Sequence, residues 1–179
     1  MTELRNLIWL FPVLFLFHDL EEIFFLMPWV RKNHAAIIAR FPQLPTQIIN
    51  QVSSVSSTAF ALGVLEELIL ILLICFFAFQ YGWYALWSGG VLAFTFHLLV
   101  HLAQVVIYKE YIPVVITSLL CLPVCAIMIA AIIHTVKSAD IWIYSSFVTL
   151  AMGLNLWLIH IGMAAFDRQK LRGSDTTLP

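Results

Sequence analysis

Apolar residues gather along this chain in five long runs, at about residues 7–27, 58–79, 83–108, 112–133 and 141–166. A helix that crosses the hydrocarbon core of a bilayer needs ~20 apolar residues, and each run is long enough. The pattern therefore predicts an all-α fold: a polytopic membrane helix bundle with five transmembrane helices.

Residues 29–57 form the one long polar interval, which holds Arg31, Lys32 and Arg40, two prolines and a serine-rich end. We expect a loop here, with a short amphipathic piece at about 35–41. The first run is not expected to be a cleaved signal peptide, because it contains Glu21 and Glu22 and no cleavage site follows it. No internal repeat is evident, so residues 1–179 are expected to form a single transmembrane domain.

Composition supports this class of protein. The chain is 62% hydrophobic and 11% charged over 179 residues, whereas soluble domains average roughly 45–50% apolar and about 25% charged. Its net charge of −1 offers no basic surface for nucleic acid. The composition therefore excludes an ordinary soluble domain and indicates the lipid bilayer as the surrounding medium.

The positions of lysine and arginine predict an orientation. In a five-span arrangement the side of the N-terminus carries Arg5 and Lys137, and the other side carries the remaining seven basic residues: Arg31, Lys32, Arg40, Lys109, Arg168, Lys170 and Arg172. Cytoplasmic loops are the ones enriched in lysine and arginine. We therefore expect the N-terminus outside, and the C-terminus and the 29–57 loop in the cytoplasm.

Ionisable residues inside the apolar runs are acidic or histidine, never lysine or arginine. The acidic ones are Asp19, Glu21, Glu22, Glu66 and Glu67. Counted at ~1.5 Å per residue, carboxylates and histidines from four predicted helices share a depth roughly 8–17 Å from one membrane face. A buried charge there costs at least ~2.5–3.5 kcal/mol without a partner, so these carboxylates need protons, histidinium or a metal ion.

Spacing favours the metal. His18 and Glu22 are four residues apart, as are His97 and His101, and side chains at this spacing share a helix face and can bind one ion. The predicted ligands are His18, Glu22, Glu66, Glu67, His97, His101 and His160. We expect Asp19, Gln104 and Asn155 to contact the ligands, and Glu21 to act as the general base.

The string Phe17-His18-Asp19-Leu20-Glu21-Glu22 in the first run resembles the motif of the HXXEE family of membrane proteins. A second block is similar to that family as well: His101-Leu102-Ala103-Gln104 through Tyr108, then Tyr111-Ile112-Pro113 and Thr117. A glycine often follows that proline in the family, and Val114 stands there in this chain. The resemblance covers about residues 7–166. It implies functional roles for His18, Glu21, Glu22, His97 and His101, and it supplies no reaction.

Together these features predict a membrane metalloenzyme. Imidazole and carboxylate are the usual ligands of zinc, and also of iron and manganese, with one or two ions bound. A metal-dependent hydrolase would act on a lipid-like or membrane-borne amide or ester, with the ion activating water and the carbonyl. The alternatives are a di-iron oxidase or desaturase, a non-enzymatic ion carrier or sensor, a proton or ion path, and a purely structural polar core.

Overall fold

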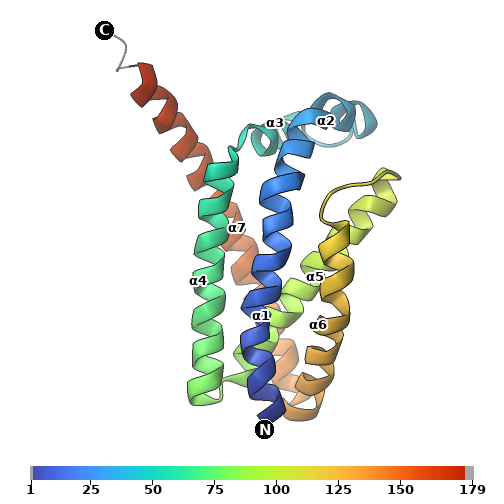
Figure 1. The fold of residues 1–179 in the computed structure, drawn as a ribbon, viewed down its shortest axis with the longest axis vertical. Helices are drawn as coiled ribbons and strands as arrows, with labels where there is room; N and C mark the ends of the chain where they lie inside the picture. The colour runs from blue at the N-terminus through green and yellow to red at the C-terminus, as the bar shows by residue number, and fades with distance from the viewer. Residues whose placement is uncertain (1, 176–179) are drawn as a thin grey trace.

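The computed structural model describes the backbone of residues 2–175 and the side chains of residues 4–159 and 161–163. The described chain is all-α. Its elements are α1 (Thr2–Glu21), a π-helical turn η1 (Glu22–Leu26), α2 (Met27–Arg40), α3 (Thr46–Ser54), α4 (Ser57–Tyr81), α5 (Tyr84–Tyr108), α6 (Val115–Thr135) and α7 (Ser138–Asp175). In Figure 1, α1 lies between α4 and α6 and contacts both, while α5 and α7 pack together behind them.

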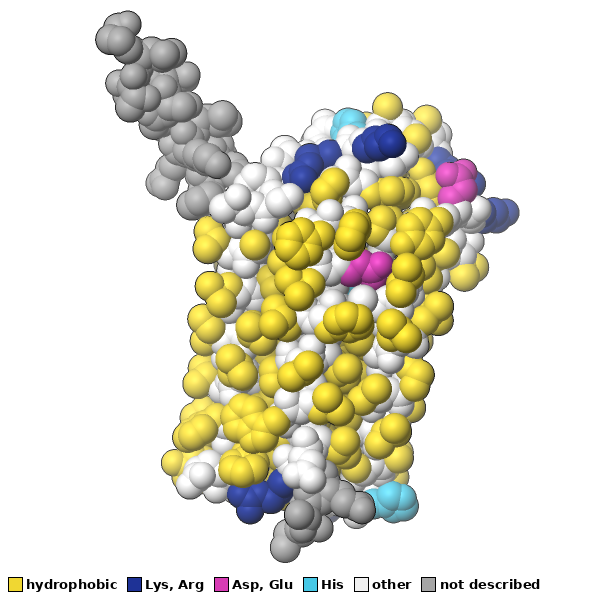
Figure 2. Space-filling view, in the orientation of Figure 1, with side chains coloured by type: hydrophobic (Ala, Val, Ile, Leu, Met, Phe, Trp, Pro, Cys, Tyr) yellow, Lys and Arg dark blue, Asp and Glu magenta, His cyan; other side chains and the backbone are white. Residues whose placement is uncertain are grey.

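Four of these helices are long and apolar enough to cross a membrane: α4, α5, α6 and the Ser138–Met163 part of α7. Only 12–33% of each apolar segment is buried inside the protein, so most of this surface faces outward. Figure 2 shows the result, an apolar belt with lysine and arginine side chains at its two ends. The first predicted span is not among the four: α1 ends at Glu21 and carries four charged residues, Glu3, Arg5, Asp19 and Glu21.

The buried faces of α1 and α5 bring polar residues into the bundle. Along α1 and into η1, one set of buried positions recurs every three or four residues and ends in polar side chains: Leu4, Ile8, Phe11, Phe15 and His18 on α1, then Glu22 in η1. On α5 they are Trp87, Val91, Phe94, Leu98 and His101. Such a period keeps one helix face toward the core. The apolar packing that joins the two helices therefore also places His18 and Glu22 near His101.

The 29–57 segment differs from the loop expected for it, since most of it folds as α2 and α3. The helix of α1 continues through η1 into α2, and Pro28 lies in the first turn of α2. Arg31 donates to Val55 O at 2.8 Å and to Ser57 Oγ at 2.9 Å. These bonds fix α2 and α3 over one end of the bundle (Figure 1).

Close contact between α5 and α7 depends on Gly89. A Cβ atom at this position would lie 2.7 Å from both Tyr144 O and Val148 Cγ2. These distances are too short for any side chain, so glycine permits the approach of the two helices.

Candidate metal centre

Four side chains from α1, η1 and α5 converge inside the bundle. Glu22 Oε1 lies 2.8 Å from His101 Nε2, 3.7 Å from His97 Nε2 and 4.0 Å from His18 Nε2. The Nε2 atoms of His97 and His101 are 3.0 Å apart. All four ligand atoms lie within 4.8 Å of one another. We call these residues, His18, Glu22, His97 and His101, the His/Glu group.

The spacing of the group suits one tetrahedral ion. Metal–ligand bonds of about 2.0–2.1 Å separate the ligand atoms of a tetrahedral zinc site by about 3.3–3.4 Å. Four of the six separations between the ligand atoms of the group run from 2.8 to 4.0 Å, and all six are within 4.8 Å. Only small side-chain shifts separate this arrangement from coordination.

Lone pairs meet at the centre of the group. His101 Nδ1 is 3.1 Å from Gln104 Oε1, an amide oxygen that only accepts, so His101 donates there. In a neutral imidazole this leaves a lone pair on His101 Nε2, which faces the carboxylate of Glu22. His18 Nε2 is buried and has no hydrogen-bond partner among the described residues. Converging lone pairs repel each other unless a cation lies between them, so this donor set fits a metal ion.

The group is mostly buried, and no lysine or arginine among the described residues forms an ion pair with it. The side chains of His18, Glu22 and His101 are 0–7% exposed, whereas that of His97 is 37% exposed. His97 is therefore the open side of the group. The π-helical turn begins at Glu22, where Met27 N–H donates to Glu22 O. Such turns inside α-helices are frequent at functional sites.

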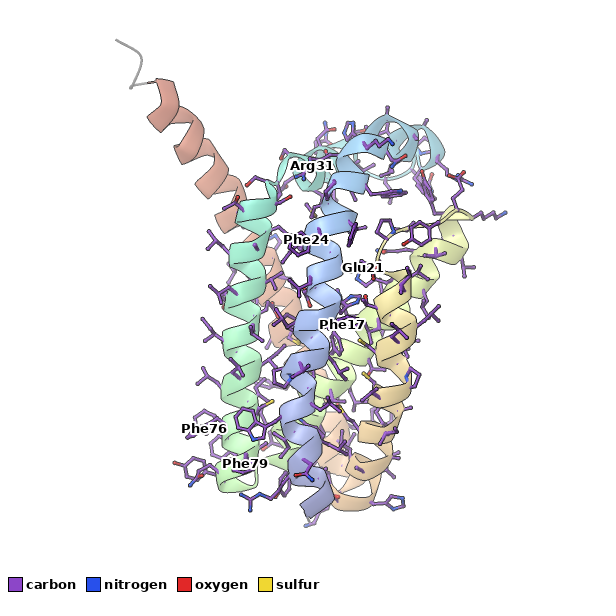
Figure 3. All side chains as sticks on the ribbon, in the orientation of Figure 1. Phe17, Glu21, Phe24, Arg31, Phe76 and Phe79 are labelled. Atoms are coloured by element: carbon purple, nitrogen blue, oxygen red, sulfur yellow. The ribbon has the colours of Figure 1, made fainter. Side chains whose placement is uncertain are left out.

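Glu21 and Asp19 lie beside the group without joining it. Glu21 Oε2 is 2.6 Å from Thr117 Oγ1 and 3.0 Å from Thr117 N, at the start of α6. Figure 3 labels Glu21 between α1 and α6, and an acidic side chain is visible at that place within the apolar belt of Figure 2. Asp19 is buried, and its Oδ2 has no hydrogen-bond partner among the residues that the structure describes.

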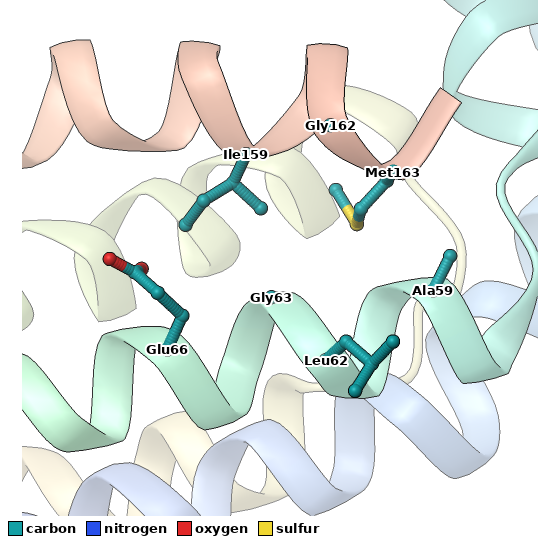
Figure 4. A pocket seen from close by; sticks show the side chains of 7 residues that line it. All are labelled: Ala59, Leu62, Gly63, Glu66, Ile159, Gly162 and Met163. Atoms are coloured by element: carbon teal, nitrogen blue, oxygen red, sulfur yellow. The ribbon is translucent and has the colours of Figure 1, made fainter. Parts of the chain in front are cut away.

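Glu66 and Glu67 form a second polar cluster on α4. Asn155 of α7 donates from Nδ2 to Glu66 Oε2 at 3.0 Å and to Glu67 Oε1 at 2.9 Å. Glu66 also lines a pocket of about 230 Å³ between α4 and α7 (Figure 4). The other lining residues are apolar or glycine: Ala59, Leu62, Gly63, Ile159, Gly162 and Met163.

The predicted site residues therefore divide into distinct sets. Gln104 contacts His101 of the His/Glu group, whereas Asn155 contacts Glu66 and Glu67. The side chain of His160, a predicted ligand, lies outside the described residues. Thr117 was not predicted as a site residue. Its place in the Tyr-x-Pro block four residues after Pro113 was the only signal for it.

Comparison with known proteins identifies a family. Residues 9–128 match the family described as "Protein of unknown function with HXXEE motif". No curated protein and no solved structure matches the chain significantly. The family match spans well over half of the sequence and contains all four members of the His/Glu group. The protein therefore belongs to the HXXEE family.

Proposed function

We propose that this protein is an integral membrane metalloenzyme that hydrolyses a lipid-like or membrane-borne amide or ester. One observation carries the proposal, namely the convergence of three imidazoles on the buried Glu22 carboxylate, where His18 Nε2 has no hydrogen-bond partner among the described residues. His18, Glu22, His97 and His101 would hold a divalent transition metal. When bound, the ion supplies Lewis-acid activation of a carbonyl or phosphoryl oxygen.

Zinc is our first candidate, and iron or manganese are the others. Imidazole and carboxylate are both zinc ligands, whereas a di-iron centre in a helical bundle uses several carboxylates. Glu66 and Glu67 lie outside the His/Glu group, where Asn155 donates a hydrogen bond to one oxygen of each carboxylate. This contact supports a single ion at the His/Glu group.

A substrate dissolved in the membrane suits the location of the site. The group lies on α1 and α5, and α4, α5, α6 and α7 present mostly outward-facing apolar surface. We include α1 as the fifth transmembrane helix, because it packs between α4 and α6 along the bundle. The excess of basic residues beside α2 and α3 supports a cytoplasmic position for that end.

The general-base role predicted for Glu21 stays a prediction. Its Oε2 accepts two hydrogen bonds from Thr117 at the start of α6. We therefore assign no proton-transfer step to Glu21 from this geometry. The side chains of the His/Glu group hold the ion, and the partly exposed His97 marks the side from which a substrate reaches it.

Elemental analysis of protein purified in a mild detergent tests the proposal. We expect about one transition-metal ion per chain in the wild type and little in His101→Ala. His134→Ala is the control, because His134 is exposed and far along the chain from the group. A zinc-loaded preparation should then hydrolyse membrane-borne ester or amide probes.

Three results would contradict this proposal in different ways. If the folded wild type contains no metal ion, the proposed metal centre is wrong. Iron in place of zinc favours the oxidase or desaturase. Bound zinc without hydrolysis of any amide or ester probe favours a non-enzymatic carrier or sensor.

A further inference from the structure

Thr117 links α1 to the start of α6 through three hydrogen bonds. Its backbone N–H is one of the first N–H groups of α6, which have no partner within the helix. The N–H donates to Glu21 Oε2 at 3.0 Å, and the hydroxyl donates to the same oxygen at 2.6 Å. His18 Nδ1 lies 2.9 Å from the hydroxyl oxygen. All three residues are buried.

Counting hydrogens gives each bond its direction. A hydroxyl carries one hydrogen, and a distance of 2.6 Å to a carboxylate oxygen is typical of O–H···O⁻. The hydroxyl of Thr117 therefore has no hydrogen left for His18 and accepts from His18 Nδ1–H instead. A neutral imidazole has one N–H, so His18 Nε2 keeps its lone pair. That atom lies 4.0 Å from Glu22 Oε1, inside the His/Glu group.

The turn before α6, next to the contact between Glu21 and Thr117, has a strained backbone at Val114. Val114 has a φ of 94°, a conformation that glycine adopts readily and a β-branched residue rarely does. A non-glycine residue in this conformation persists only where its surroundings fix it. Val114 offers α6 no side-chain cap, so Glu21 reaches across from α1 to cap this helix at Thr117.

We propose that Glu21 and Thr117 are positioning residues that hold His18 in its Nδ1–H form and direct its Nε2 lone pair at the metal. This inference rests on the proposed metal centre. Metal-binding histidines usually donate their other ring N–H to a carboxylate, a carbonyl or water, which fixes the tautomer and the ring orientation. Here a threonine hydroxyl stands between the imidazole and the carboxylate.

Two substitutions separate this role from simple helix capping. Thr117→Val removes the hydroxyl but keeps the backbone N–H bond to Glu21, so the cap survives. Thr117→Ser keeps both bonds. Loss of such a partner typically lowers metal affinity about 10–100-fold. We expect that loss for Thr117→Val and near wild-type affinity for Thr117→Ser, measured by competition with a chromogenic zinc chelator.

The tautomer is read directly by nitrogen NMR of ¹⁵N-histidine-labelled protein in the metal-free state. The His18 signal is the one missing from His18→Gln. We expect the Nδ1–H form in the wild type and in Thr117→Ser, and a population of the Nε2–H form in Thr117→Val. The proposal is overturned if wild-type His18 is in the Nε2–H form, or if Thr117→Val keeps both the tautomer and the affinity. A wild type that binds no zinc overturns the proposed function instead, whatever the tautomer.

Discussion

Replacing Glu22 by glutamine tests the centre of the site most directly. Glu22 Oε1 is the atom that approaches all three imidazoles, at 2.8, 3.7 and 4.0 Å. Glutamine keeps the shape of the side chain and removes its charge. Structural zinc sites bind with about 10–16 kcal/mol, which is roughly 2.5–4 kcal/mol for each of four ligands. At ~1.4 kcal/mol per factor of ten, loss of this ligand should weaken zinc binding roughly 60- to 700-fold.

Glu66→Gln is the matched control for this measurement. Glu66 is a carboxylate on an apolar helix as well, but its Oε2 accepts from Asn155 and lies outside the His/Glu group. Both variants are titrated with zinc against a chromogenic chelator, and size-exclusion profiles establish that each is folded. Unchanged affinity in Glu22→Gln, or an equal loss in Glu66→Gln, would refute the assignment of Glu22 as the central ligand.

Three further predictions concern stability. Chelation of zinc should lower the unfolding midpoint in thermal scans, because an ion at 100 times its dissociation constant adds about 2.7 kcal/mol to the free energy of unfolding. An unchanged midpoint would contradict zinc binding to the folded state. Asn155→Leu should destabilise the protein by about 1–3 kcal/mol in detergent unfolding while metal content stays constant, because two carboxylates lose their donor. Loss of metal in this variant would contradict the separation of Glu66 and Glu67 from the metal site. Gly89→Val should destabilise the protein by at least about 1–3 kcal/mol. Gly153→Val is the control and should be tolerated, since nothing lies within 4 Å of a Cβ atom there. Equal losses of stability in the two variants would refute the close contact of α5 and α7.

The sequence alone predicts long apolar helices suited to a membrane. It also predicts two pairs of residues in the candidate site, one on the first helix and one on the helix that carries His97 and His101. An apolar run of ~20 residues that crosses lipid satisfies its backbone hydrogen bonds within itself by forming a helix. Likewise, His18 with Glu22 and His97 with His101 share a helix face in any α-helix, because their spacing of four residues is close to one turn. The charge imbalance also indicated the importance of these residues, since no lysine or arginine accompanies the buried carboxylates.

The partners of each carboxylate were decided by tertiary packing. Glu21 and Glu22 are adjacent in sequence, yet one caps α6 at Thr117 and the other meets the histidines of α5. Glu66 and Glu67 shared the predicted depth of the ligands, but Asn155 of α7 holds both of them. Helical periodicity states which residues share a face, whereas the choice of facing helix depends on side-chain packing between distant segments. For this reason the sequence determined which side chains are available for a metal, and only the fold decided which four of the described ones meet.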